Sequence, residues 1–443
     1  MMARGKKVQT LTAEEKLEQA LVPEGEHPYV IPENWIWTQL GCICEVQNGP
    51  NFSGLNFPYL DVKTLRGNKD FIFKSEGALV LPGSRVILVD GENSGEVFLI
   101  NTEGYLGSTL RLLDFAAPNN AQYIEYFIAQ HKEQLKKNKK GSAIPHLNKE
   151  IFYALSFPLP PLPEQHRIVA RIESLFEKLD HARELVQSAL DSFETRKASI
   201  LHKAFTGELT AKWREKNGVG IESWKNVSIS EICSSLQYGT SKKSKKVGRV
   251  VVVRMGNLQD GEIVWDHLAY TDDEEEINKY LLSTGDVLFN RTNSPALVGK
   301  TSIYRGEMPA IFAGYLIRLN YKKDMILGEY LNYLLNSTEA KKYCIKVKTD
   351  AVNQSNINAK KIGAYHFNLP TVPEQQKIVN ILNKLLEKEY TTKDELEPTL
   401  DQIDLMKKSI LARAFRGELG TNDPSEESAM EFLKEILVKG DQS

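Results

Sequence analysis

The sequence is poor in cysteine and contains no long apolar run. Its four cysteines form no C-x-x-C pair and no zinc-ligand spacing, which excludes a disulfide scaffold and a zinc-ribbon protein. No apolar segment approaches the ~18–20 residues that span a bilayer. The first residues lead into polar sequence without the apolar core of a signal peptide. These absences predict a cytoplasmic protein with reduced thiols and no membrane partner.

An excess of charge of one sign is also missing. Lysine and arginine number 56 against 58 aspartates and glutamates, and the formal net charge is −2. Such a chain carries no global signature of a polyanion partner, so any nucleic-acid surface must be local, with acidic residues segregated elsewhere. The length of 443 residues is enough for about two to four domains.

What the sequence does contain is an internal repeat. Residues 159–169 (LPPLPEQHRIV) return as residues 369–379 (LPTVPEQQKIV), and residues 199–209 (SILHKAFTGEL) return as residues 409–419 (SILARAFRGEL). Both pairs are offset by the same 210 residues, so no insertion separates the two ends of the block. This pattern indicates duplication of one structural unit.

Each repeated block predicts one long helix, the first arm over residues 159–215 and the second arm over residues 369–420. Pro163 and Pro373 are typical of a first helical turn, and the glutamate after each proline is favourable at the positively charged N-terminal end of a helix. A glycine at the end of each block is typical of a helix C-terminus. Apolar residues recur at alternating steps of four and three, which is the heptad seam of a coiled coil. The seam residues are Ile168, Ile172, Leu175, Leu179, Val186, Phe193 and Ile200 in the first arm, and Ile378, Leu382, Leu385, Leu396, Ile403, Met406 and Ile410 in the second.

Two such seams in one chain most simply pack against each other. The second arm contains Pro398 in mid-helix, which is expected to kink or interrupt it. We interpret Glu164 and Glu374 as helix-start residues and not as an acid/base pair.

The segments before the arms, residues 31–158 and 222–368, are different in kind. They hold short β-like runs separated by Gly and Asn turns, and both open near a tryptophan, Trp35 and Trp224. The fold class expected is α+β, with two globular domains of mixed short strands and helices. These domains alternate with two long helices that pack as an antiparallel coiled-coil spacer.

Short extensions flank this body. An N-terminal extension, residues 1–30, carries a capping box that predicts a helix over residues 12–21. A C-terminal tail, residues 421–443, predicts another short helix over residues 424–438. We expect the two short helices to come together and, with the arm surfaces, to contact partner proteins.

Lysines stand beside amide- and hydroxyl-rich loops in both globules. Cations neutralise phosphates, and Asn, Gln, Ser and His side chains can read base edges. The DNA-binding candidates in the first globule are Lys136, Lys137, Lys139, Lys140, Ser142, His146 and Asn148. Those in the second are Lys242, Lys243, Lys245, Lys246, Arg254, Arg291, Asn293, Lys346, Lys348, Asn353, Gln354, Ser355 and Asn356. Lysine runs are often only solvated surface, but their equivalent placement in the two globules favours DNA contact.

The duplicated LPxxPEQ block, the long helix and the SIL-x-x-AF-x-GEL ending, each after a divergent globule, resemble the specificity (S) subunits of Type I restriction–modification systems. The resemblance covers nearly the whole chain and is most specific at residues 157–210 and 367–420. It implies that the globules are target-recognition domains and that each reads one half of a bipartite double-stranded DNA site. It also implies a chain with no cofactor of its own, which recruits two modification subunits carrying S-adenosylmethionine and, in some systems, restriction subunits.

Signals for chemistry in this chain are weak. Gly299-Lys300-Thr301 resembles the end of a P-loop, but Ser294 stands where a P-loop requires glycine. The histidines do not group with carboxylates at metal spacing. We therefore expect no catalytic, cofactor-binding or metal-binding residues, and we interpret the acidic run at residues 272–276 as a solvated face that balances the basic loops. Three alternatives remain: a specificity subunit of a Type II-like system, a coiled-coil scaffold that does not read DNA, and a self-contained methyltransferase.

Overall fold

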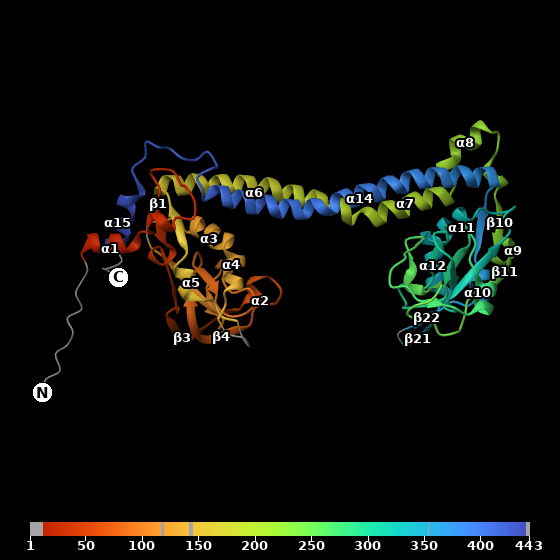
Figure 1. Ribbon diagram of the computed structural model, residues 1–443, viewed down its shortest axis with the longest axis horizontal. Coiled ribbons are helices and arrows are strands. Elements are labelled where there is room, and N and C mark those ends of the chain that lie inside the picture. Colours follow the sequence, from red (N-terminus) through yellow and green to blue (C-terminus); the bar gives the residue numbers. More distant parts are fainter. Residues whose placement is uncertain (1–11, 117–118, 141–144, 353, 440–443) are drawn as a thin grey trace. The chain divides into compact units, whose positions relative to one another are not determined.

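The chain forms two compact units that each combine one globule with parts of both arms. The computed structural model describes residues 12–116, 119–140, 145–352 and 354–439. Unit 1 comprises Met1–Leu185 together with Thr399–Ser443, and unit 2 comprises Val186–Pro398. Figure 1 shows the succession along the chain of globule, long helix, globule and long helix, which confirms the predicted architecture.

The first globule is built on a four-stranded antiparallel sheet. Its order is β2-β8-β5-β6, with bounds Cys44–Gln47, Leu110–Phe115, Arg85–Leu88 and Val97–Leu99. A small closed barrel contains β3 (Asn51–Leu60), β4 (Phe73–Val80) and β7 (Gly104–Leu106). The short helices are α2 (Val62–Leu65), α3 (Ala121–Gln130), α4 (Lys132–Lys137) and α5 (Lys149–Tyr153). Tyr123, Phe127 and Phe157 fill the core in edge-on ring contacts.

The second globule repeats this plan. Its main sheet has the order β11-β20-β16-β18, with bounds Cys233–Tyr238, Leu316–Tyr321, Val287–Asn290 and Thr301–Ile303. A second sheet has the order β15-β12-β19, with bounds Tyr270–Thr271, Val250–Val253 and Ala310–Phe312. The later helices are α11 (Gly328–Leu335), α12 (Thr338–Val347) and α13 (Ala359–Gly363). The shared strand order and helix succession show that the duplication includes the globules, whose sequences match only faintly.

In each globule the first strand pairs with the last, directly before the arm begins. β1 (Ile36–Gln39) runs antiparallel to β9 (Ser156–Leu159), with Ile36 opposite Leu159. β10 (Lys225–Ser228) runs antiparallel to β23 (His366–Leu369), with Lys225 opposite Leu369. The entry to and the exit from each globule therefore meet at the start of a long helix.

The arms are α6 (Leu162–Asp191), α7 (Phe193–Phe205) and α14 (Val372–Ala414). The first arm is divided by a single turn residue, Ser192, whereas the second arm is one helix of 43 residues that contains Pro398. Of the two effects expected of Pro398, a kink or an interruption, the interruption does not occur, because the helix continues through this residue. Pro398 and Asp394 are exposed, so the carbonyl that loses its helical donor is open to water.

The two arms pair in antiparallel fashion in each unit. In unit 1, Lys407 forms an ion pair with Asp180, and Arg183 forms one with Asp404. In unit 2, Arg196 Nε lies 2.8 Å from Glu389 Oε2. These pairs are partly exposed to solvent and contribute little stability by themselves, about 0–1 kcal/mol each. They do, however, identify the register of the helix pair, that is, which residues of the two helices lie opposite each other.

Burial along the predicted seam is uneven. Ile168, Ile172, Ile378 and Leu382 are fully buried because they belong to the cores of the globules. Phe193 and Ile403 are also buried, while the seam residues Leu175, Leu179, Val186, Ile200, Leu385, Leu396 and Ile410 are only half-buried. Away from the globules, packing between the two arms therefore buries few seam side chains completely.

The seam prediction is wrong at Met406, which is 51% exposed. The next residue, Lys407, takes its place, with Nζ 5.0 Å from the ring centre of Phe176. A straight α-helix has 3.6 residues per turn, so a strict heptad drifts away from the contact line over several turns.

The short terminal helices, α1 (Ala13–Ala20) and α15 (Ala429–Lys439), pack against each other in unit 1, as predicted. The capping box predicted for α1 is present between Thr12 and Glu15. Leu433 and Ile436 of α15 are buried in the same core as the first globule. α15 begins later than predicted, because residues 424–426 form a turn that precedes it. Within the described part of the chain, no helix is long and apolar enough to cross a membrane.

Candidate nucleic-acid interface

In unit 2 the predicted polar loop is a β-hairpin. β17 (Thr292–Asn293), β22 (Gln354–Asn356) and β21 (Thr349–Ala351) form a sheet in the order β17-β22-β21. Asn293 lies opposite Ser355 in this sheet, so two groups of predicted residues that are distant in the sequence come together. In Figure 1, β21 and β22 lie at the end of unit 2 that points away from α7 and α14. A two-stranded ribbon of this kind fits the major groove of B-DNA.

The side chains of this hairpin divide into two groups. Asn356 donates to Thr292 Oγ1 at 2.7 Å, and Ser355, which is 1% exposed, hydrogen-bonds Asp350. A hydrogen bond from Lys348 lowers the pKa of Asp350, with that from Ser355 as the second cause. These side chains hold the hairpin together, whereas Gln354 is exposed and available to a ligand.

Arg291 lies at the base of the same hairpin and is half-buried. Its guanidinium carbon is 4.8 Å from the ring centre of Tyr238, and its Nη1 donates to the carbonyl of Gly314 at 3.2 Å. Arg254, by contrast, belongs to a separate turn after β12, where its guanidinium donates to the carbonyl of His267. The predicted arginines are therefore not part of one cluster.

Unit 1 builds the corresponding edge from the loop after β5 and the loop before α5. The Gly91 N–H donates to the Pro145 carbonyl at 2.8 Å, and His146 Nδ1 lies 2.5 Å from Asp90 Oδ1. Lys139 donates to the Glu92 carbonyl, which belongs to the loop after β5. The loop after the central strand is thus joined to the polar loop in both units.

The remaining predicted residues of these loops have local roles. Lys140 Nζ lies 2.9 Å from Glu150 Oε2, in a pair whose side chains are both mostly exposed. Asn148 is the N-cap of α5, with its side-chain oxygen accepting from the N–H of Ile151. Asn293 in unit 2 accepts from the N–H of the residue that follows it. The sequence pattern indicates these positions but not the turns that they stabilise.

Two of the predicted DNA-binding residues cannot be assigned a place at these edges. Ser142 in the first globule and Asn353 in the second lie outside the described residues. The geometry of the two polar edges therefore rests on the neighbours of these residues.

The predicted lysines fall into paired and unpaired groups. Lys136 and Lys137 are exposed in the last turn of α4, and Lys346 is exposed in the last turn of α12. None of the three forms an ion pair with any residue whose position is described. α4 and α12 directly precede the polar loop of their unit, so both loops have beside them cations for which no ion pair is described.

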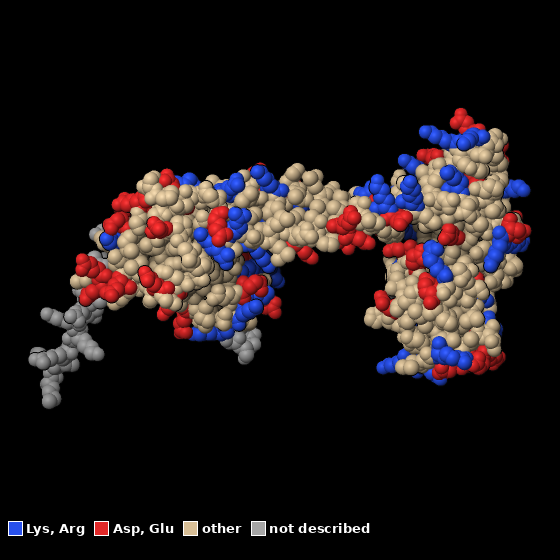
Figure 2. Space-filling view, turned by 45° about the horizontal axis from the view of Figure 1, so that its top comes forward, with Lys and Arg blue, Asp and Glu red and all other residues tan. Residues whose placement is uncertain are grey.

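The lysines near β12 are instead neutralised. Lys242 Nζ lies 2.8 Å from Asp273 Oδ2, and Lys245 Nζ lies 3.1 Å from Asp272 Oδ2. Hydrogen bonds from these two lysines are the main causes that lower the pKa of Asp273 and Asp272. Figure 2 shows basic and acidic side chains interspersed over the visible face of unit 2. The acidic run therefore balances the basic loop by direct contact, and only Lys243 and Lys246 of that loop are exposed without a described ion pair.

The repeated Pro-Glu-Gln sequence has a role that the sequence did not reveal. In unit 1, Glu164 is fully buried and accepts a hydrogen bond from Trp35 Nε1 at 2.7 Å. Gln165 is also fully buried; it donates to the Pro160 carbonyl at 3.1 Å and accepts from the N–H of Asn120 at 3.0 Å. Asn120 is the N-cap of α3. One helical turn of the arm thus binds two separate parts of the globule.

Unit 2 repeats these contacts. Glu374 accepts from Trp224 Nε1 at 2.9 Å. Gln375 donates to the Pro370 carbonyl at 2.9 Å and accepts from the N–H of Leu327, the N-cap residue of α11, at 2.9 Å. We call Trp35, Glu164 and Gln165 in unit 1, and Trp224, Glu374 and Gln375 in unit 2, the Trp-Glu-Gln lock. The signal available in the sequence was a repeated Glu-Gln pair together with a tryptophan at the start of each globule.

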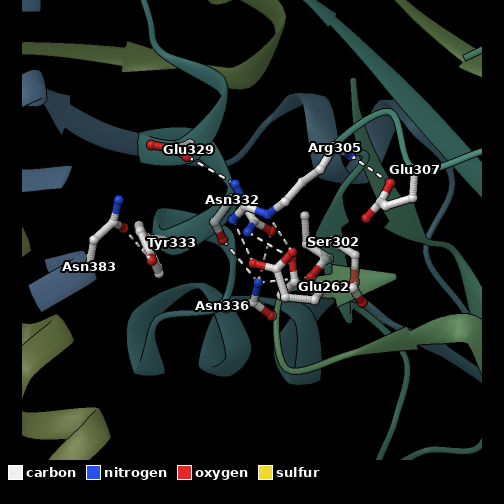
Figure 3. Close-up of polar contacts among 11 residues, drawn as sticks. Glu262, Ser302, Arg305, Glu307, Glu329, Asn332, Tyr333, Asn336 and Asn383 are labelled. Atoms are coloured by element: carbon white, nitrogen blue, oxygen red, sulfur yellow. Dashed lines mark hydrogen bonds and ion pairs between the residues drawn. The ribbon is translucent and has the colours of Figure 1, made fainter. Parts of the chain in front are cut away.

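The two locks differ in their remaining donors. Asn422 donates to Glu164 Oε2 at 2.8 Å, so that carboxylate is held by neutral groups. Glu374 is held by Thr210 and by Arg214, whose Nη1 lies 2.7 Å from Glu374 Oε1. The Arg214 side chain is only 10% exposed, which makes this a buried ion pair. A second contact ties the same globule to its arm, because Tyr333 of α11 donates to Asn383 of α14 at 2.7 Å (Figure 3).

Two globules of one fold, each with a polar edge and each locked onto an antiparallel helix pair, define a two-domain recognition protein. The family described as Type I restriction modification DNA specificity domain matches residues 32–187 and 221–398. The chain belongs to this family, and its two globules lie within the two matched copies of the domain.

Comparison with individual proteins agrees with this assignment. The chain is 27% identical over 404 residues to the Type I restriction enzyme MjaVIII specificity subunit of Methanocaldococcus jannaschii, covering 85% of this chain and 92% of that protein. It is 26% identical over 323 residues to the StySPI specificity subunit of Salmonella potsdam, covering 71% and 68%. A solved chain from a type I R-M system has the same fold, with a TM-score of 0.68 at 20% identity, covering 88% of this chain and 100% of that one.

Proposed function

We propose that this chain reads a bipartite double-stranded DNA site, one half with each globule, and recruits two modification subunits that methylate it. Restriction subunits join the same complex where the system has them. The observation that carries the proposal is the repeated polar edge: both globules join the loop after their central strand to a polar loop, beside lysines for which no ion pair is described. A scaffold that does not read DNA would require no such edge in either globule.

The methyl transfer itself takes place on the partner. S-adenosylmethionine binds to the modification subunits, and this chain supplies positioning and no reacting group. Binding of labelled S-adenosylmethionine by the isolated chain would contradict this part of the proposal.

The geometry ranks the candidate DNA contacts. We place phosphate contacts at Lys136, Lys137 and Lys346, because these cations are exposed and have no described ion pair. We place base contact at Gln354, because it is an exposed amide side chain of the hairpin. Lys242 and Lys245 are weaker candidates, because a phosphate would first have to displace an aspartate from each.

Lys346→Ala is expected to reduce the salt dependence of DNA binding. Each phosphate contact releases a counterion, so the slope of log K against log salt should become smaller by about 1. The measurement is binding of the assembled complex to its target duplex between about 50 and 200 mM salt. Lys242→Ala is the matched control and should leave the slope unchanged, because that lysine is already paired with Asp273. Equal slopes for both variants would contradict the ranking.

Mapping of N6-methyladenine tests the proposal as a whole. The chain is co-expressed with the modification subunit from its own gene cluster in a host that lacks other adenine methylation. One split motif with a constant gap is the expected result. Exchange of residues 31–158 for the corresponding segment of a relative should then change one half of the motif and leave the other half intact. A stable complex that leaves the genome unmethylated would overturn the proposal.

A further inference from the structure

The Trp-Glu-Gln lock occurs in both units with the same connections. A buried glutamate accepts from the indole N–H of a tryptophan that directly precedes the first strand of the globule. The neighbouring buried glutamine accepts from the N-cap amide of the first helix after the main sheet. All four carboxylate and carboxamide side chains belong to residues that are 0% exposed. Helix initiation alone does not require such complete burial. Its repetition in two globules with divergent sequences indicates a further role that the two copies share.

The connections determine how each globule sits on its arm. Trp35 and Asn120 are far apart in the sequence of the first globule, yet both bind to consecutive residues of α6. The last strand, β9, leads into the same helix and supplies a third, covalent attachment. These three attachments to one helical turn, together with the packing of Ile168 and Ile172 in the core of the globule, oppose rotation of the globule about its connection. Unit 2 has the same three attachments through Trp224, Leu327 and β23.

From this geometry we infer that the lock residues are positioning residues that set the number of base pairs between the two halves of the DNA site. The inference rests on the proposed function. In B-DNA each added base pair moves a half-site by ~3.4 Å along the axis and turns it by about 35°. A globule held rigidly on its arm cannot follow that movement, so only one gap is accepted. A globule with a loosened attachment can follow it at lower cost.

Different residues would then determine the base sequence of each half-site and the number of base pairs between the half-sites. Under the proposed function, bases are contacted at the polar edge; in unit 2 its strands β21 and β22 lie at the end of the globule away from α14, the helix that contains Glu374 and Gln375 (Figure 1). A lock variant should therefore keep both half-site sequences and change only the tolerance for their separation. Spacer length alone would predict no such effect, because a lock substitution leaves the number of residues in each arm unchanged.

Trp224→Phe tests the inference with the smallest change. The substitution removes the indole N–H and keeps an aromatic ring, so Glu374 loses one donor while Thr210 and Arg214 remain. The complete methyltransferase complex is supplied with plasmids that carry the two half-sites at the natural gap and at gaps one base pair shorter and longer. Methylation at the altered gaps, relative to the natural gap, is expected to rise about tenfold or more over the wild type, as loss of one buried hydrogen bond allows. Trp35→Phe should do the same through unit 1.

Phe312→Leu is the matched control. Phe312 is fully buried in unit 2 but belongs to a core cluster that contains no lock residue, so its substitution lowers stability without freeing the attachment. It should reduce methylation at all gaps in proportion. If Trp224→Phe and Trp35→Phe also reduce methylation by the same factor at all gaps, the lock is only structural and the inference is overturned. Should Trp224→Phe not fold, Trp35→Phe in the other unit provides the same comparison by itself. Failure of the proposed function is distinguishable, because the wild type would then show no split motif at all.

Discussion

Glu374→Ala is expected to destabilise unit 2 by about 3–5 kcal/mol, the usual cost of removing one partner from a buried ion pair. The substitution leaves the guanidinium of Arg214, whose side chain is 10% exposed, without its carboxylate. It also removes the acceptor of the Trp224 indole and of the Thr210 hydroxyl. Hydrogen exchange at increasing denaturant, followed in peptides from each unit, measures the change. Peptides from unit 1 should remain protected, because none of these groups belongs to that unit.

The duplication provides the control for this experiment. Glu164→Ala removes the equivalent carboxylate in unit 1, where the donors Trp35 and Asn422 are neutral. Its cost should be smaller, about 1–3 kcal/mol, since no buried cation is left behind. A larger loss for Glu164→Ala than for Glu374→Ala would contradict the assignment of Arg214 as the source of the difference.

Phe415→Ala is expected to destabilise unit 1 by about 3–5 kcal/mol, because it opens a cavity among aromatic rings. Phe415 is fully buried, with its ring centre 5.1 Å from that of Tyr123 and 5.3 Å from that of Phe127. The residue stands at the end of the second arm, far along the sequence from those partners. The loss of stability should therefore appear in peptides from the first globule, again by hydrogen exchange.

Phe205 occupies the equivalent place in the first copy of the repeat and serves as the comparison. It is only half-buried and meets a single ring, Tyr330, at 5.4 Å among the described aromatic contacts. Phe205→Ala should lower the free energy of unfolding less than Phe415→Ala. Fewer contacts are lost, and the cavity that remains is less completely closed to water. Unchanged protection of the first-globule peptides in Phe415→Ala would show that the second arm does not complete the core of unit 1.

The two units differ in which parts of the sequence form them. Unit 1 contains both ends of the sequence, and its core combines the first globule with Leu411, Phe415 and the buried residues of α15. Unit 2 closes its core with residues from the middle of the chain. The two copies of the module therefore share their lock contacts although only one of them is continuous in sequence.

Much of the architecture could be predicted from the sequence. The 210-residue offset between two PEQ blocks and two SIL blocks revealed the duplication, and helical periodicity between them revealed the arms. The lysines beside amide-rich loops were also visible as a pattern. These features are local or periodic, and local patterns reflect backbone preferences that act before any tertiary contact forms.

The structure alone decided which of those residues are free to act. Lys242 and Lys346 have the same appearance in the sequence, but the fold places Asp273 against the first and no described acid against the second. Met406 matched the heptad, yet helix geometry turned it outward. Pro398 is exposed, and its helix continues through it.

The Trp-Glu-Gln lock shows the physical reason for this division. The sequence displayed a glutamate and a glutamine at a helix start, where exposed residues of these types would be ordinary. Their burial depends on a tryptophan more than a hundred positions earlier and on a helix N-terminus from within the globule. Composition and spacing determined the modules and their order. Long-range packing determined which polar side chains became buried attachments and which remained open to a ligand, because burial is a property of neighbours that only the folded chain brings together.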